Sequence, residues 1–156
     1  ISTFFGYGYL TKIPGTVTSL VTAVFIYIAY ELLGYTALKF SIIFFLLLFF
    51  YSFYAVKDAE SEFKNKDPRQ IVIDEVLGQA MPLILVLHLS QSNQLSLQIE
   101  IYYVLSFIFF RFFDILKPFP VSYFDKNFKN YFGIIMDDIM AGLYSMILIY
   151  LISLKF

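Results

Sequence analysis

Long apolar blocks alternate with short polar segments along this chain of 156 residues. Each block is near or slightly below the roughly 20 residues that a helix needs to cross a bilayer. The blocks are Val17–Leu33, Leu38–Val56, Val76–Leu89, Ile99–Phe113 and Ile139–Leu154. Extending the third block back to Ile71 and the fifth back to Ile134 makes both long enough to span. The pattern therefore predicts an all-α, polytopic membrane helical bundle of about five spans.

The segments between the blocks carry signals for helix starts and chain breaks. Asp67-Pro68 is typical of a helix start, with Asp67 as the N-cap and Pro68 at the first helical position. Pro82 predicts a kink inside the third block. Lys117-Pro118-Phe119-Pro120 breaks the chain after the fourth block. The amphipathic stretch Val121–Tyr131 then predicts a short surface helix.

Composition supports a membrane protein and removes several classes of chemistry. Hydrophobic residues make up 60% of the chain and charged residues 15%, against about 45–50% and about 25% in soluble domains. The length predicts one domain, residues 1–156. The chain has no Cys and a single His, His88, which excludes thiolate sites, cysteine nucleophiles and mechanisms that need two histidines. A net charge of −1 gives no reason to expect a nucleic-acid partner.

The distribution of charge predicts an orientation. If five spans alternate, the side that holds the N-terminus receives nine of the eleven basic residues, and the other side only Lys39 and Lys155. Basic residues concentrate on the cytoplasmic side of membrane proteins. No cleavable signal peptide is expected, because the first block follows a Gly/Pro-rich loop and not a basic segment. The cytoplasmic side also receives the acids Asp74, Glu75, Asp114, Asp137 and Asp138.

Two pairs of adjacent acids stand at the mouths of apolar segments. Asp74-Glu75 and Asp137-Asp138 each follow three apolar residues and precede a small residue, Gly78 or Gly142. A carboxylate near hydrocarbon is costly and is a functional hypothesis by default. We expect both pairs in the first turns of helices, where the macrodipole favours negative charge.

The small residues suggest how these acids meet. Glycine lets two helices approach closely, which would bring the acids of two helices to one point. Oxygen ligands in a chain without Cys favour Mg²⁺ over softer metals. The alternative is that the acids are helix N-terminal charges paired with Lys or Arg. The candidate metal ligands are Asp74, Glu75, Asp137 and Asp138.

Basic residues follow the fourth block at helical spacing. Arg111 and Lys117 are candidates to hold phosphate oxygens, with Asp114 between them as a water-orienting or metal-binding acid. The alternative is a ladder of i,i+3 ion pairs at a membrane interface. Near the N-terminus, Gly15 and Thr16 lead into the first block and suggest a helix terminus that offers N–H groups to an anion, with Thr16 as N-cap. This last signal is weak on its own, and an ordinary turn and cap explains it better.

Four motifs follow one another over nearly the whole chain: Gly6-Tyr7-Gly8…Pro14-Gly15-Thr16…Ser19, Asp67-Pro68…Ile71–Gly78, Phe110–Pro120 and Gly133–Gly142. In this order they resemble the motifs of the bacterial phosphatidylglycerophosphatase A family, whose members are Mg²⁺-dependent membrane phosphatases of phospholipid synthesis. The chain departs from the family pattern at Thr18 and Phe132, and no charged motif residue is missing.

The resemblance implies hydrolysis of phosphatidylglycerol phosphate to phosphatidylglycerol and inorganic phosphate at the cytoplasmic face of the bacterial inner membrane. We expect Asp114, Asp138 and Arg111 to be catalytic, and Arg111, Lys117, Thr16 and Gly15 to bind substrate. One rival is a small cation channel or transporter that uses the acids as an ion site; a phosphatidyltransferase is another, but its longer aspartate run is absent. The number of ions and the oligomeric state stay open.

Overall fold

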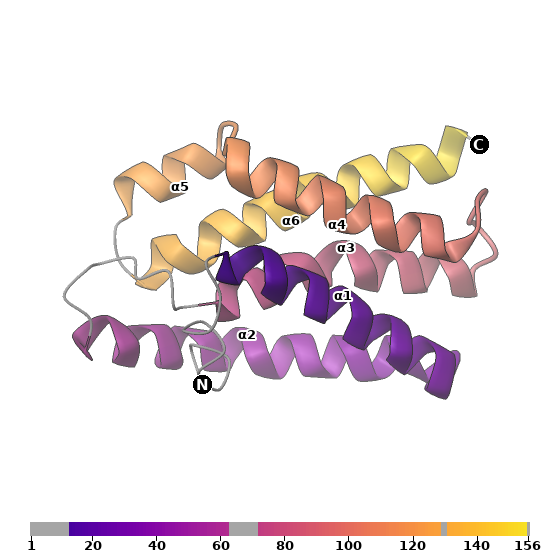
Figure 1. Cartoon of the computed structure of the whole chain (residues 1–156), viewed down its shortest axis with the longest axis horizontal. Coiled ribbons are helices and arrows are strands. Elements are labelled where there is room, and N and C mark those ends of the chain that lie inside the picture. Colours follow the sequence, from indigo (N-terminus) through magenta and orange to yellow (C-terminus); the bar gives the residue numbers. More distant parts are fainter. Residues whose placement is uncertain (1–12, 63–71, 129–130, 156) are drawn as a thin grey trace.

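The computed structural model describes residues 13–62, 72–128 and 131–155, all of whose regular structure is helical. This confirms the predicted all-α fold, and each predicted block lies within one helix. The helices are α1 (Pro14–Leu33), α2 (Thr36–Glu62), α3 (Ile73–Gln91), α4 (Ile99–Leu116), α5 (Val121–Asn127) and α6 (Tyr131–Lys155) (Figure 1).

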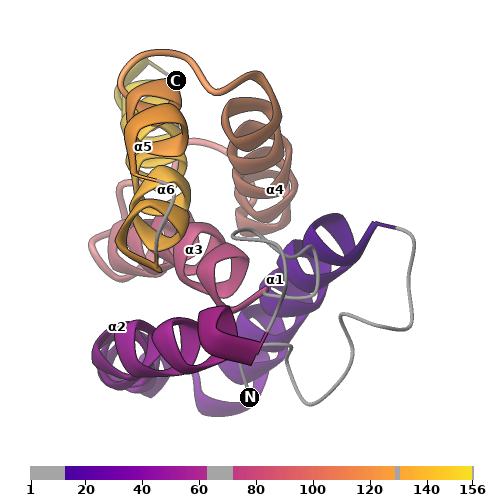
Figure 2. The same cartoon turned by 90° about the vertical axis from the view of Figure 1, so that its left-hand side faces the viewer.

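Helix α3 lies at the centre of the bundle and contacts α1, α2, α4 and α6. Figure 2 looks onto the end of the bundle at which α1, α3 and α6 begin, and shows the other long helices around α3. Helix α4 runs in the opposite direction and ends at this same end, followed by α5 (Figure 1). The starts of three helices and the end of a fourth therefore lie together, and they carry the charged motifs.

Burial follows this arrangement. Helix α3 buries residues on most of its circumference, including Leu77, Leu83 and Leu87. The outer helices expose large apolar side chains, such as Leu47 and Phe50 of α2, at 68% and 72%. An apolar surface of this extent is unfavourable in water and matches a lipid environment.

Within the described residues, four helical segments are long and apolar enough to cross a membrane: Pro14–Leu33, Thr36–Val56, Ile73–Gln91 and Phe132–Lys155. The structure is therefore a helical membrane bundle, as predicted. Helix α4 carries three charged residues, Glu100, Arg111 and Asp114, within its 18 residues. Its crossing of the membrane as a fifth span stays a prediction.

Several predicted helix boundaries were wrong. Asp137 and Asp138 do not lie in the first turn of their helix, because α6 begins earlier, at Tyr131. Phe132 at this start packs against the rings of Phe53, Phe124 and Phe128, which favours the longer helix.

The short helix α5 ends at Asn127, before the predicted limit at Tyr131. At the N-terminus, the N-cap of α1 is Ile13 and Pro14 occupies the first turn, so Thr16 is not a cap. Helix α3 runs on through Pro82. The predicted helix start at Asp67-Pro68 lies outside the described residues.

Candidate active site

The site begins with a close crossing of α3 and α6 at two glycines. A Cβ atom added to Gly142 would lie 2.5 Å from the carbonyl oxygen of Gly78, and one added to Gly78 would lie 2.7 Å from the carbonyl oxygen of Asp138. Real Cβ atoms essentially never come this near to other atoms. The close approach predicted from these small residues is confirmed, and it brings the acids of the two helices together.

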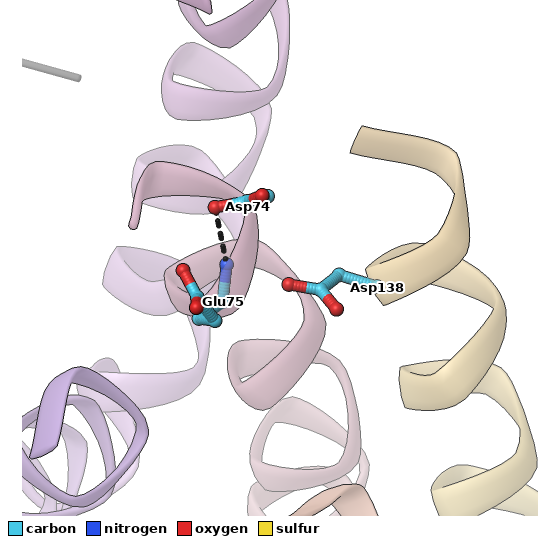
Figure 3. Close-up of side chains that lie close together, drawn as sticks. All are labelled: Asp74, Glu75 and Asp138. Carbon is cyan, nitrogen blue, oxygen red and sulfur yellow. Dashed lines mark hydrogen bonds between the residues drawn. The ribbon is translucent and has the colours of Figure 1, made fainter. Parts of the chain in front are cut away.

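Three carboxylates converge above this crossing. Asp74, Glu75 and Asp138 each offer a carboxylate oxygen, and these oxygens all lie within 4.8 Å of one another. Figure 3 shows Asp138 extending from α6 toward the consecutive acids Asp74 and Glu75 of α3. Asp74 and Asp138 are buried, and Asp74 Oδ1 accepts a hydrogen bond of 3.1 Å from the backbone N–H of Glu75. We call Asp74, Glu75 and Asp138 the carboxylate cluster.

Asp137 is not part of this cluster. Its Oδ2 lies 2.6 Å from Lys117 Nζ, across the contact between α4 and α6. Its Oδ1 accepts a hydrogen bond of 3.0 Å from the backbone N–H of Asp138. Consecutive helical residues point about 100° apart, so α6 directs Asp138 toward α3 and Asp137 toward the end of α4. The predicted pairing of the acids with Lys or Arg therefore applies to Asp137.

Helix α4 contributes a second ion pair beside the cluster. Arg111 Nη1 lies 2.5 Å from Asp114 Oδ2, and the two side chains are only 15% and 14% exposed. Asp114 comes within side-chain hydrogen-bonding reach of Asp138, and Glu75 interacts electrostatically with both Arg111 and Asp114. Arg111 Nε has no hydrogen-bond partner among the described residues. A half-buried cation with an unused donor thus lies next to three carboxylates.

The first turn of α1 reaches the same place. A Cβ atom added to Gly15 would collide with the Glu75 carboxylate and would lie 3.3 Å from Arg111 Nη1. The first amides of a helix have no partner within the helix, so this end brings N–H donors near the acids. Thr16 is half-buried in the same turn. No described contact ties its side chain to the cluster.

The structure therefore gathers most of the predicted site from four helices. The predicted ion-pair ladder along α4 holds between Arg111 and Asp114, whereas Lys117 pairs with Asp137 of α6. His88 lies exposed at the far end of α3, away from the carboxylate cluster.

One residue of the site region was missed. Gln79 is fully buried one helical turn after Glu75. The sequence did contain a signal for it: Gln79 is a polar residue inside the apolar block Val76–Leu89, four residues after Glu75.

Comparison with known proteins identifies the family of this chain. The family model described as phosphatidylglycerophosphatase A matches residues 1–153. A phosphatidylglycerophosphatase A of Haemophilus influenzae is 36% identical over 149 residues, which cover 96% of this chain and 84% of the relative. A putative phosphatidylinositol-3-phosphatase of Bacteroides thetaiotaomicron is 37% identical over 150 residues, which cover 96% and 89%.

A shorter match, 43% identical over 47 residues, links the chain to phosphatidylglycerophosphatase A of Escherichia coli, and covers 30% of this chain. No solved structure matches the chain. The family match extends over nearly all of the residues and includes every helix that contributes to the carboxylate cluster. The chain belongs to the phosphatidylglycerophosphatase A family.

Proposed function

We propose that this protein is a Mg²⁺-dependent lipid phosphatase that hydrolyses phosphatidylglycerol phosphate to phosphatidylglycerol and inorganic phosphate. The observation that carries the proposal is the carboxylate cluster of Asp74, Glu75 and Asp138, with Arg111 beside it. Acids that can hold a hard cation, next to a basic side chain that can bind phosphate oxygens, suit phosphoryl chemistry. Membership of the family supports the choice of a phosphatase over a channel or transporter.

The donor set fits Mg²⁺. All three groups offer oxygen, the ligand that Mg²⁺ prefers, and their oxygens lie within 4.8 Å of one another. Glu75 Oε2 is buried and has no hydrogen-bond partner among the described residues. Like charges this close repel one another, so a cation between them offsets both the repulsion and the cost of burial. Asp74, Glu75 and Asp138 would hold the ion.

The protein's own residues would carry the remaining steps. Mg²⁺ held by Asp74, Glu75 and Asp138 would supply positive charge near the phosphoryl group and would help to activate the attacking water. Asp114 lies beside Asp138 and would orient that water and accept its proton. Arg111 would bind the phosphoryl oxygens as negative charge spreads over them. The first amides of α1 at Gly15 and Thr16 would add neutral donors on the same side.

Lys117 has a different part in this proposal from Arg111. Its ion pair with Asp137 holds it at the edge of the cluster, 28% exposed. There it would attract the phosphate of an incoming headgroup, and Asp137 would keep its ammonium group in position. In this proposal Asp137 is therefore the partner of Lys117 and not a metal ligand.

The position of the site suggests how a lipid reaches it. The cluster lies beside the first turns of α1 and α3, toward the end of the bundle that Figure 2 faces. The acyl chains would stay among the apolar outer surfaces of the helices while the headgroup enters the site. The bias of basic residues in the sequence supports the cytoplasmic face of the inner membrane for this end.

The identity of the lipid headgroup is the most specific part of the proposal. The relative from Bacteroides thetaiotaomicron is described as a putative phosphatidylinositol-3-phosphatase, which makes an inositol lipid phosphate the natural competitor in an assay. The purified protein in mixed micelles should therefore be offered phosphatidylglycerol phosphate and phosphatidylinositol 3-phosphate separately. We expect phosphate release from the glycerol lipid with Mg²⁺, its loss in EDTA, and its return when Mg²⁺ is restored.

Variants complete the test. Asp138→Asn should lose the activity, whereas Glu100→Gln, which neutralises an exposed acid at the far end of α4, should keep it. Release that persists in EDTA would reject the metal, and release from the inositol lipid alone would reject the proposed substrate. Cation flux through liposomes without phosphate release would instead favour the channel.

A further inference from the structure

A layer of buried polar groups lies directly beneath the carboxylate cluster. Gln79 of α3, Thr18 of α1 and Ser106 of α4 are at most 1% exposed. Both polar atoms of the Gln79 amide, Thr18 Oγ1 and Ser106 Oγ are without a hydrogen-bond partner among the described residues. Nothing in the proposed mechanism uses them.

Helical geometry places this layer one turn deeper than the site. Gly15, Glu75 and Arg111 approach one another at the mouth of the bundle. Thr18 follows Gly15 by three residues and Gln79 follows Glu75 by four, so each lies on the same helix face one turn further in.

Ser106 precedes Phe110 by four residues, and the ring of Phe110 packs on Gly78. Because α4 runs opposite to α3, the residue one turn before Phe110 also lies deeper in the bundle. Helices α1, α3 and α4 all contact one another. Thr18 and Gln79 therefore lie at a similar depth in the core, and Ser106 lies about one turn deeper.

Burying such groups for packing alone would be unfavourable. An amide or hydroxyl buried without a partner costs about 1–3 kcal/mol. An apolar side chain of similar shape avoids this cost and is neutral or stabilising in its place. Gln79 lies next to another unpartnered atom, Glu75 Oε2, on the same face of the same helix. A donor, Gln79 Nε2, and an acceptor, Glu75 Oε2, thus lie one helical turn apart, and neither makes a hydrogen bond to a described residue.

We propose that Gln79 is a positioning residue for the carboxylate cluster: in the metal-loaded protein its Nε2 donates to Glu75 Oε2 and holds that carboxylate toward the ion. Thr18 and Ser106 would satisfy the rest of the Gln79 amide, directly or through an ordered water. The inference rests on the proposed function, since it takes the cluster to be a metal site. Partners of this kind typically change metal affinity about 10- to 100-fold when removed.

The test measures metal binding rather than activity. Mn²⁺ serves as the probe, because free Mn²⁺ gives an electron paramagnetic resonance signal that falls when the ion is bound. The full chain in detergent is titrated as wild type, as Gln79→Met and as Ser41→Ala. Gln79→Met keeps the shape and removes the amide. Ser41→Ala removes another buried, unpartnered hydroxyl, from α2 near the opposite end of the bundle.

We expect Gln79→Met to bind Mn²⁺ about 10- to 100-fold more weakly, with a metal-free Tm equal to or above that of the wild type. Ser41→Ala should bind like the wild type. Wild-type affinity in Gln79→Met would overturn the role of Gln79 while leaving the metal site intact. A wild-type protein that binds no Mn²⁺ would overturn both this inference and the proposed function.

Should Gln79→Met fail to fold, Gln79→Asn decides. This variant keeps a buried amide, but its side chain is one methylene shorter, so the amide lies further from Glu75. A folded Gln79→Asn with weakened Mn²⁺ binding supports the proposal, and one with undiminished binding overturns it.

Discussion

Gly142 of α6 packs on Gly78 of α3 so closely that a methyl group on Gly142 would lie 2.5 Å from the Gly78 carbonyl oxygen. Asp138 lies one helical turn before Gly142, and Glu75 lies three residues before Gly78 on the facing helix. The distance between the two helices at the glycines therefore sets the distance between the carboxylates. The atoms that a methyl group on Gly142 would meet belong to the backbone of Gly78, which cannot move aside as a flexible side chain can.

Gly142→Ala should separate α3 and α6 and reduce both stability and activity. Inserting a methyl group into a tightly packed contact typically costs about 1–3 kcal/mol, and wider spacing would weaken metal binding. Thermal unfolding and phosphate release measure the two effects. Ser145→Ala, one turn further along α6, is the matched control, because it adds no atoms and removes only a hydroxyl bonded to the Ala141 carbonyl. Equal activity in Gly142→Ala would show that the close crossing is not needed.

Gly15→Ala should lower activity with little loss of stability. The new methyl group would collide with the Glu75 carboxylate, which can rotate away but then leaves the cluster. We expect about a tenfold fall in activity, equivalent to about 1.4 kcal/mol in the barrier. Gly34→Ala is the converse control: it has open space around it but a φ of +54°, so it should cost about 1–3 kcal/mol of stability and leave activity unchanged. The same response in both variants would contradict the role assigned to Gly15.

Arg111→Ala should reduce kcat about 100-fold or more, because it removes a donor aimed at developing phosphoryl charge. It also leaves the half-buried Asp114 without its ion-pair partner, so lost stability has to be separated from lost chemistry. The double variant Arg111→Ala/Asp114→Asn removes the unpaired charge and should recover stability without recovering activity. Arg111→Lys keeps the charge but not the planar fork and should be intermediate. Full activity in a folded Arg111→Ala would make this pair purely structural.

Lys117 and Asp137 should act as a unit. Their ion pair of 2.6 Å is half-buried, with the carboxylate 9% exposed. Lys117→Ala and Asp137→Ala should each weaken activity, mainly through KM, and the double variant should be little worse than either single one. A coupling free energy of about 0.5–3 kcal/mol is typical of residues in direct contact. Strictly additive effects would show that Lys117 works independently of Asp137.

Mg²⁺ should stabilise the protein against unfolding. A ligand that binds only the folded state at 100 times its Kd contributes about 2.7 kcal/mol, which a Tm measurement in detergent detects. Asp138→Asn should be at least as stable as the wild type in EDTA, because it removes one of three mutually repelling charges, and should gain little from Mg²⁺. A Tm of Asp138→Asn that rises with Mg²⁺ as much as that of the wild type would remove Asp138 from the ligands.

The helices and the identity of the acids were predictable from local pattern. Apolar blocks of nearly bilayer length specify helices whatever their neighbours are, and Gly78 and Gly142 at fixed distances from the acids predicted the close crossing. The start of α6 was not predictable in this way. It depends on Phe132 packing against Phe53, which lies far away in the sequence, in α2.

Which acid joins the carboxylate cluster and which one pairs with Lys117 was decided only by the tertiary structure. Asp137 and Asp138 are equivalent in the local pattern, yet one binds Lys117 and the other faces Asp74 and Glu75. Adjacent helical residues point about 100° apart, so the rotation of α6 about its axis selects which of them faces α3. The contact of Gly142 with Gly78 sets that rotation. A repeating local pattern determines where helices form, whereas the convergence of side chains depends on how those helices cross.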